Sequence, residues 1–411
     1  MSHLCVCVEK ASIAVAPAEE GTQGDQDQSA MSSDQLTSSL PVLNCQPDHH
    51  DYRITTSIGQ GFDGFAKIYV ALHKPSSTFI VVKKTNVDFQ SSHQLQDLEH
   101  EVKILRSLHH PNILPLYSAF ISSQELWTVF PLMSYGSCTD VLMGSFPDGM
   151  PEVLISCILK ELFQGLEYLQ RMSIIHRGIK GGHVLIGTDG MVCLSGFRNS
   201  VKLDPHTNTS GVAFDVPLHA IDVLPWMAPE ILQQDLQGYH YTADIYSVGI
   251  LAIELAHGTV PYTGHPPTKI LLEKLQNPSP RLGDAPQDMS DTSTIGTDST
   301  TTTTTTTTTN TALEAKDPSS SRAPKKFSST FHQIVDTCVQ RDPHSRPYAG
   351  TLLGHSFFKQ VKKRTRDLIP EYLSDVPLLT HRQDERSLEQ DLESISAANS
   401  LASMTLDEWV F

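Results

Sequence analysis

The chain has 411 residues, enough for one large two-lobed domain or two smaller ones with a buried core. Its formal charge of −16 argues against nucleic-acid or membrane partners, because phosphate-rich surfaces need a concentrated basic footprint. No apolar run reaches the roughly 18 to 20 residues that span a bilayer, and no secretory signal is recognisable. The seven cysteines have no paired spacing for zinc. We therefore expect a soluble intracellular protein with reduced thiols, which binds a protein or a small molecule.

The N-terminal third predicts a β-rich unit after a disordered leader. Residues 1–51 are rich in Ser, Gln, Asp and Glu, a composition that cannot bury enough apolar surface to fold. Short β-branched runs separated by turn residues follow, together with one amphipathic helix. The expected strands are Arg53–Ile58, Lys67–His73, Thr78–Thr85, Leu116–Phe120 and Trp127–Phe130, and the expected helix is Gln94–Leu108. Residues 52–133 therefore predict a small lobe of about five strands and one helix.

Beyond residue 133 the pattern becomes mainly helical. Residues 278–326, rich in Pro, Ser and Thr, predict a disordered insertion. The expected helices are Leu154–Arg171, Ala243–Ala256, Thr268–Leu275 and Phe331–Gln340, with a hairpin at Val184–Leu194. The large lobe should thus span residues 134–358, followed by a polar tail at 359–405 and a terminal motif at 406–411. The predicted fold class is α+β.

Several motifs fall in the order and spacing of a protein kinase. They comprise a glycine-rich loop, a strand lysine, a helix glutamate and several large-lobe signatures. In chain order these are Gly59-Gln60-Gly61, Lys83, Glu101, His176-Arg177, Ala228-Pro229-Glu230, Asp244 to Gly249, and Arg346-Pro347. One such signal is weak evidence, but together they resemble a bilobal protein kinase over residues 52–358.

The positions that carry kinase chemistry are changed. A kinase needs a catalytic-loop aspartate to deprotonate the substrate hydroxyl, and an asparagine and a second aspartate to hold magnesium. This sequence has Gly178, His183 and Gly196 at those positions. Glycine cannot accept a proton, and imidazole is a poor ligand for a hard cation that prefers oxygen. We therefore predict a pseudokinase without a catalytic residue and without a bound metal.

Residues that hold the active shape of a kinase are retained. The spine expected between the two lobes comprises Leu105, His176, Phe197 and Asp244, whose carboxylate should bond the backbone near the histidine. Glu230 and Arg346 are expected to form the ion pair that secures the activation segment, which spans residues 196–230. Two interpretations stay open: a closed, active-like shape presented to a partner, or core residues that any such fold needs.

The nucleotide pocket of the resembled kinases is partly preserved. The residues that the resemblance implies are Ile58, Gly59, Gly61, Lys83, Glu101, Pro131 and Met133, with the Pro131 carbonyl and the Met133 amide facing adenine. The glycine loop is two residues longer after Gly61, and Ala66 replaces its third glycine. The alternatives are magnesium-independent ATP binding without catalysis and a purely structural Lys83–Glu101 bridge.

A set of short segments narrows the resemblance. They are Gly178 to His183, Gly196-Phe197-Arg198, Leu224-Pro225-Trp226, Gln237-Gly238-Tyr239, Ser247 to Ile250, and His355 to Lys359. Together they resemble the STRAD family, the sterile-20-related adaptor pseudokinases, and the alpha member more than the beta. The resemblance implies a protein that binds and allosterically activates a Ser/Thr kinase of the liver kinase B type without phosphorylating it. A weak atypical kinase and a passive scaffold remain the alternatives.

The same resemblance gives a role to the end of the chain. In that family a helical-repeat scaffold, mouse protein 25, completes a three-protein complex by gripping a C-terminal Trp-Glu-Phe. The ending here is Trp409-Val410-Phe411, so we expect Trp409 and Phe411 to bind such a scaffold; an incidental aromatic terminus is the alternative. The family implies a cytoplasmic and nuclear protein, and the basic cluster at residues 359–366 predicts a nuclear import signal or a solvated helix end.

Overall fold

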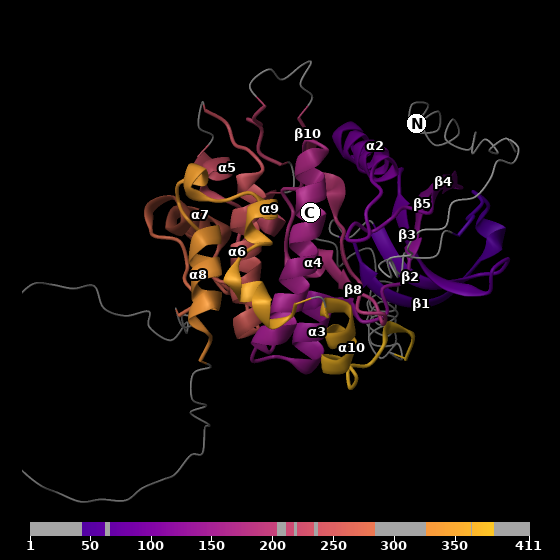
Figure 1. The fold of residues 1–411 in the computed structure, drawn as a ribbon. Helices are drawn as coiled ribbons and strands as arrows, with labels where there is room; N and C mark the ends of the chain where they lie inside the picture. Colours follow the sequence, from indigo (N-terminus) through magenta and orange to yellow (C-terminus); the bar gives the residue numbers. More distant parts are fainter. Residues whose placement is uncertain are drawn as a thin grey trace, which may run out of the picture.

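The computed structural model describes residues 43–61, 66–203, 211–217, 220–233, 237–283, 326–362 and 364–381, which form a β-rich small lobe and a mainly helical large lobe (Figure 1). The small lobe is one antiparallel sheet in the order β1-β2-β3-β5-β4, with one helix. Its elements are β1 (Tyr52–Gln60), β2 (Ala66–His73), β3 (Thr78–Asn86), α2 (Ser92–Ser107), β4 (Ser118–Ser122) and β5 (Glu125–Pro131). The predicted lobe of five strands and one helix is confirmed.

Strand β3 lies at the centre of this sheet and has two different faces. Ile80 and Val82 are fully buried in the small-lobe core, as the alternation of side chains along a strand requires. Val81 and Lys83 alternate with them and line a cavity on the opposite face. The pairing of Lys83 with Ile68 of β2 and Thr128 of β5 fixes this register on both sides.

The small lobe begins earlier than the sequence predicts. Cys45 is buried in the small-lobe core, and the Tyr52 hydroxyl donates a hydrogen bond to the Gln46 carbonyl at 2.8 Å. A short 3₁₀ helix, η2 (His49–Asp51), then leads into β1. The leader boundary at residue 51 is therefore wrong for residues 43–51, because a few apolar side chains in this polar stretch suffice to anchor it. Residues 1–42 lie outside the described part of the chain.

The large lobe is built around helix α6, which is buried along nearly its whole length. Its α-helices are α3 (Cys138–Ser145), α4 (Glu152–Arg171), α5 (Pro229–Gln233), α6 (Thr242–His257), α7 (Pro267–Gln276), α8 (Ser329–Cys338), α9 (Ala349–Leu352) and α10 (Thr365–Tyr372). Its 3₁₀ helices are η3 (Gly181–His183), η4 (Phe197–Asn199), η5 (Ala220–Val223), η6 (Pro343–Ser345), η7 (Ser356–Gln360) and η8 (Leu379–His381). The four predicted large-lobe helices are all present, with ends shifted by a few residues.

Short strands connect the large lobe to the region between the lobes. They are β6 (Gly136–Ser137), β7 (Ile174–Ile175), β8 (Val184–Ile186), β9 (Val192–Leu194) and β10 (Val201–Lys202). Strands β8 and β9 form the predicted antiparallel hairpin. Its turn includes Gly190 at φ +75°, where a Cβ would lie 2.0 Å from the Arg366 carbonyl oxygen, so this turn requires glycine.

The predicted polar tail is in part folded onto the large lobe. Ile369 and Leu373 are fully buried in the main core, and the Thr365 hydroxyl donates to buried Glu161 at 2.6 Å. The prediction is wrong for residues 359–381, because these apolar positions recur at helical spacing within an otherwise polar segment. Residues 382–411, including Trp409 and Phe411, lie outside the described residues.

The predicted insertion also starts later than residue 278. Leu282 is 1% exposed and belongs to the main core, so residues 278–283 are part of the large lobe. Residues 284–325, including the threonine run, lie outside the described residues. Within the described ranges five cysteines are present, and all five are buried and form no disulfide. No helix in those ranges combines the length and apolar character of a membrane span.

Candidate functional site

A cavity of about 430 Å³ lies between the two lobes. Strands β1 to β3 contribute one wall, the hinge after β5 a second, and the loops before and after the β8–β9 hairpin a third. It is lined by all seven predicted pocket residues, Ile58, Gly59, Gly61, Lys83, Glu101, Pro131 and Met133. The structure therefore brings these residues together at one cavity, although the first and last of them, Ile58 and Met133, are 75 positions apart in the sequence.

Lys83 and Glu101 form an ion pair at the back of this cavity. The Lys83 Nζ atom lies 3.2 Å from Glu101 Oε2, and their side chains are 23% and 11% exposed. Glu101 is carried by α2, whose first turn is fixed by a capping box between Ser91 and Gln94. The pair holds α2 against the sheet in the position that an active kinase requires.

The glycine loop needs only one of its two described glycines for close packing. The Gly61 amide donates to the Ala66 carbonyl at 2.6 Å, and a Cβ at Gly61 would lie 2.5 Å from the Ala66 Cβ. A Cβ at Gly59 would meet nothing within 4 Å. Residues 62–65, where the loop is longer than the kinase pattern, lie outside the described residues.

The His183 ring fills the space between Gly178 and Gly196. Its Nδ1 atom lies 2.6 Å from the Gly178 carbonyl oxygen, which accepts the ring N–H. Gly196 has φ +81°, and a Cβ there would lie 2.6 Å from the ring. Burial, followed by the nearby Lys180, lowers the pKa of His183 to about 3, so the ring is neutral at pH 7. The place where a kinase holds oxygen ligands for magnesium thus contains an uncharged imidazole.

Gly178, in contrast, is not imposed by crowding. A Cβ at this position would have its nearest neighbours at 3.4 Å, the Gly196 carbonyl oxygen and the His176 ring, which is ordinary contact. A Cβ would therefore be accommodated at residue 178. The absence of a carboxylate there is a chemical difference from active kinases and not a consequence of packing.

Two further cations line the cavity besides Lys83. Lys180 precedes η3, and Arg198 lies in η4 directly after the spine residue Phe197. Burial lowers the pKa of Lys180, while nearby acidic groups oppose that shift. Neither residue was among the predicted pocket residues. The signal in the sequence is a cation on each side of the two altered metal positions, His183 and Gly196.

The predicted spine is assembled. The rings of His176 and Phe197 meet edge to face with centroids 4.7 Å apart, and Leu105 belongs to the same buried core. The Asp244 carboxylate accepts hydrogen bonds from the backbone amides of His176 and Arg177 at 2.7 and 2.8 Å. Burial nevertheless raises the pKa of Asp244 to about 6. Helix α6 thus fixes the backbone of the catalytic loop through the Asp244 carboxylate.

The ion pair of Glu230 and Arg346 is fully buried. The Arg346 guanidinium donates to both Glu230 carboxylate oxygens at 2.6 and 2.9 Å, and to the Thr242 carbonyl at 3.0 Å. It also lies over the Tyr246 ring, 5.0 Å from the centroid. This bidentate geometry is the strong form of the pair, and it anchors the end of the activation segment on the large lobe.

A second anchor of the activation segment was missed by the sequence analysis. Arg177 Nη1 lies 2.8 Å from Asp215 Oδ2 and 2.6 Å from the Tyr239 hydroxyl, while its Nε donates to the Asn199 carbonyl at 2.6 Å. The Arg177 side chain is only 6% exposed. No local pattern links residues 177 and 215, because their contact depends on the path of the intervening loop.

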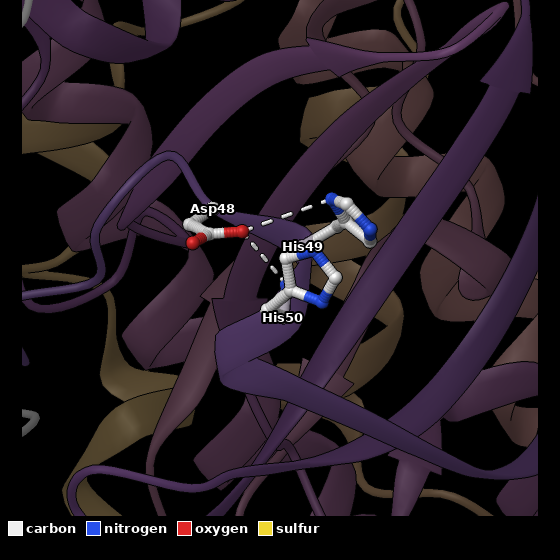
Figure 2. Close-up of side chains that lie close together, drawn as sticks. All are labelled: Asp48, His49 and His50. Atoms are coloured by element: carbon white, nitrogen blue, oxygen red, sulfur yellow. Dashed lines mark hydrogen bonds and ion pairs between the residues drawn. The ribbon is translucent and has the colours of Figure 1, made fainter.

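Among the residues that the structure describes, one group of potential metal ligands lies outside the cavity (Figure 2). Asp48, His49 and His50 place one ligand atom each within 4.8 Å of one another, and all three are exposed. The Asp48 carboxylate already caps η2 by accepting from the His50 amide at 2.9 Å. None of the three lines the cavity between the lobes, so we assign no metal to them.

The bilobal architecture, the paired Lys83 and Glu101, and the anchored activation segment define the class of this chain as a protein kinase fold. The protein kinase domain family matches residues 52–358, which is most of the chain, so the chain belongs to that family.

Similar proteins show to which branch of the protein kinase family this chain belongs. The human STE20-related kinase adapter protein alpha is 37% identical over 388 residues, covering 92% of this chain and 86% of the human protein. The Bos taurus alpha protein is 39% identical over 388 residues, covering 92% of this chain and 100% of that protein. The Mus musculus beta protein is 38% identical over 348 residues, covering 84% and 83% respectively. The chain therefore belongs to the family of STE20-related kinase adapter proteins, as its motifs predicted.

Proposed function

We propose that this chain is a catalytically inactive adaptor that binds and allosterically activates a Ser/Thr kinase of the liver kinase B type. The observation that carries the proposal is an assembled kinase framework around a catalytic loop without carboxylates. The Lys83–Glu101 and Glu230–Arg346 pairs are intact, whereas His183 and Gly196 replace the metal ligands. The relatives' name, kinase adapter, supports the same function.

The proposal includes ATP binding without magnesium. The cavity offers hinge backbone at Pro131 and Met133 for adenine. Lys83, Lys180 and Arg198 supply positive charge, which phosphates need when no metal neutralises them. The neutral His183 ring and Gly196 are an unsuitable donor set for a cation that prefers oxygen. Bound ATP would add contacts between the lobes and so stabilise the closed form.

The activation segment is the proposed docking surface for the partner kinase. It carries two exposed apolar side chains, Phe214 at 54% and Ile221 at 63%. Its two anchors, at Arg177 and at Glu230, hold this surface in a fixed shape. A partner that binds this shape better than other shapes must, by reciprocity, stabilise it.

We further propose that Trp409 and Phe411 bind a helical-repeat scaffold of the mouse protein 25 type, in the cytoplasm and the nucleus.

Reconstitution tests the proposal. The candidate kinase is assayed alone, with this chain, with the scaffold, and with both, using a peptide substrate. We expect kinase activity to rise by tenfold or more only in mixtures that contain this chain. Co-purification of the kinase without any rise in activity would favour the passive scaffold instead.

The weak-kinase alternative is tested separately. Radiolabel transfer from ATP by this chain alone is measured over a titration of magnesium or manganese, with Lys83→Ala as the control. We expect no transfer above the level of that variant. Metal-dependent transfer that Lys83→Ala abolishes would show that the chain is an enzyme.

A further inference from the structure

The chain returns to the hinge between the lobes after helix α10. Leu373 is fully buried and Val376 is 6% exposed, so this stretch is attached firmly to the large lobe. Figure 1 shows the gold segment after α10 running beside the small lobe near β1. We call residues 373–381 the hinge strap.

The strap reaches the hinge through a backbone hydrogen bond and one side chain. The Leu379 amide donates to the Ser134 carbonyl at 2.8 Å, and Ser134 directly follows Met133. Leu379 is 6% exposed and lines the cavity together with Ile58 and Met133. Leu379, which was not among the predicted pocket residues, therefore forms part of the cavity wall.

We propose that Leu379 is a specificity-determining residue of the nucleotide site, which closes the outer end of the adenine pocket against purines substituted at C2. The proposal rests on the nucleotide site of the proposed function and specifies which ligands that site accepts.

The direction of C2 follows from the hinge geometry. When the adenine N6 amine donates to the Pro131 carbonyl, N1 accepts from the Met133 amide. C2 is bonded to N1 on the side away from C6, so it points along the hinge from Met133 toward Ser134. The strap bonds to the hinge at Ser134, and Leu379 lines the cavity there. A group attached to C2 must therefore displace the Leu379 side chain, whereas unsubstituted adenine packs against it.

The size of the effect follows from the contact that a leucine gives to the ring edge. Truncation to alanine removes a few tens of Å² of apolar contact, which corresponds to roughly fivefold weaker binding of ATP. For a C2-substituted nucleotide the same truncation removes a clash. The two ligands are therefore expected to respond to one substitution in opposite directions.

The experiment compares ATP with 2-methylthio-ATP in the full chain, with EDTA present, by calorimetric titration. Wild type should prefer ATP by about tenfold or more, and Leu379→Ala should reduce that preference at least fivefold. Leu379→Met should restore it, because a thioether of similar volume refills the site. Leu378→Ala is the matched control, since this neighbour packs on the main core and does not line the cavity.

Each remaining outcome overturns a stated part of the account. ATP could bind while wild type shows no preference for ATP over 2-methylthio-ATP, or while Leu379→Ala keeps the wild-type preference. Either result would overturn the role of Leu379 and leave the nucleotide site standing. An equal loss of preference in Leu378→Ala would also overturn it, because general loosening of the strap would then be the cause. Failure of wild type to bind either nucleotide would overturn the nucleotide site, and the inference with it.

Discussion

At the scale of single residues, His183 links two of the three positions at which this sequence departs from the kinase pattern, because its ring contacts both Gly178 and Gly196. Its ring bonds the Gly178 carbonyl and leaves no room for a side chain at Gly196. An imidazole thus stands where the kinase pattern expects an oxygen ligand, and the same ring crowds the place of a Cβ at Gly196. The neutral state of the ring matters as well, because a charged imidazolium would repel Lys180 and Lys83 nearby.

The first prediction concerns pH. The folded-state pKa of His183 is lowered to about 3 from an ordinary value of 6.5, so the unfolded chain binds more protons between these values. The stability that His183 contributes is therefore complete above pH 6.5 and is lost as the pH falls toward 3. When the pH is lowered from about 7 to about 5, the unfolding free energy of wild type should therefore fall by about 1 to 2 kcal/mol more than that of His183→Asn.

Urea denaturation at the two pH values measures this difference. Exposed His344, replaced by asparagine, is the control and should behave as wild type does. The shifted pKa values of Asp244 and Glu254, which burial raises to about 6 and about 7, are common to all three proteins and cancel in the comparison. An identical pH dependence in wild type and His183→Asn would contradict the buried neutral ring.

The second prediction is a coupling between residues 183 and 196. Gly196→Asp introduces a Cβ 2.6 Å from the His183 ring at φ +81°, so it should lower the unfolding free energy by about 2 to 3 kcal/mol. In the His183→Asn background the smaller side chain should reduce that cost by about 1 kcal/mol or more. A double-mutant cycle from denaturation midpoints measures the coupling, and strictly additive effects would argue against the steric account.

At the scale of elements, the activation segment is anchored in its middle and at its C-terminal end by contacts that need no phosphate. Glu230 anchors its C-terminal end to Arg346, and Asp215 anchors its middle to Arg177. In regulated kinases a phosphate on this segment orders it by pairing with arginine. Here the carboxylate of Asp215, a residue of the chain itself, contacts the Arg177 guanidinium without a phosphate.

The third prediction follows from the Asp215 contact. Asp215→Asn should speed hydrogen exchange of the amides at residues 211–217 several-fold and leave global stability nearly unchanged, because the Asp215 side chain is 61% exposed. Arg177 keeps its bonds to Tyr239 and Asn199 in this variant. Hydrogen-exchange mass spectrometry measures the effect, with Asp336→Asn on the surface of α8 as the control. Unchanged protection at 211–217 would show that Asp215 does not hold the segment.

Elements with strong periodic patterns were predictable from the sequence, and contacts set by the path of the chain were not. Helix α4 buries one long apolar face, so its helical period is visible without a structure, whereas α6 is recognisable as an apolar segment of helical length. The spine, the Lys83–Glu101 pair and the cavity residues could be named because kinase motifs fix their relative places. The sequence predicted a polar tail where the hinge strap lies, because its apolar residues are few and show no strand or long helical period. The position of Leu379 at the hinge depends on tertiary packing alone.

At the scale of the whole molecule, the two lobes meet around one cavity to which distant parts of the chain contribute. Lys83 and Glu101 come from the small lobe, Lys180 and Arg198 from the large lobe, and Leu379 from the hinge strap. A ligand in this cavity contacts all three parts at once. It is therefore expected to stabilise one relative arrangement of the lobes, and a partner that recognises that arrangement would gain affinity.

The fourth prediction concerns the proposed scaffold contact. In an extended peptide Trp409 and Phe411 point to the same side, and each can bury roughly 150 to 250 Å² in an apolar pocket. Trp409→Ala with Phe411→Ala should abolish binding of a C-terminal peptide to the scaffold and only weaken the three-protein complex. Val410→Glu should leave binding equal or stronger. Fluorescence polarisation measures both, and loss of binding in Val410→Glu would refute the proposed role of this ending.

The most direct test of the central claim is the affinity of the full chain for ATP in EDTA and in saturating magnesium. If ATP binds as proposed, with the neutral His183 ring at the metal position and Lys83, Lys180 and Arg198 near the phosphates, the two dissociation constants should agree within about twofold. Lys83→Ala should weaken both equally. ATP binding that becomes tenfold or more tighter with magnesium would show that the cavity holds the metal. It would contradict the claim that this kinase fold binds nucleotide without a metal.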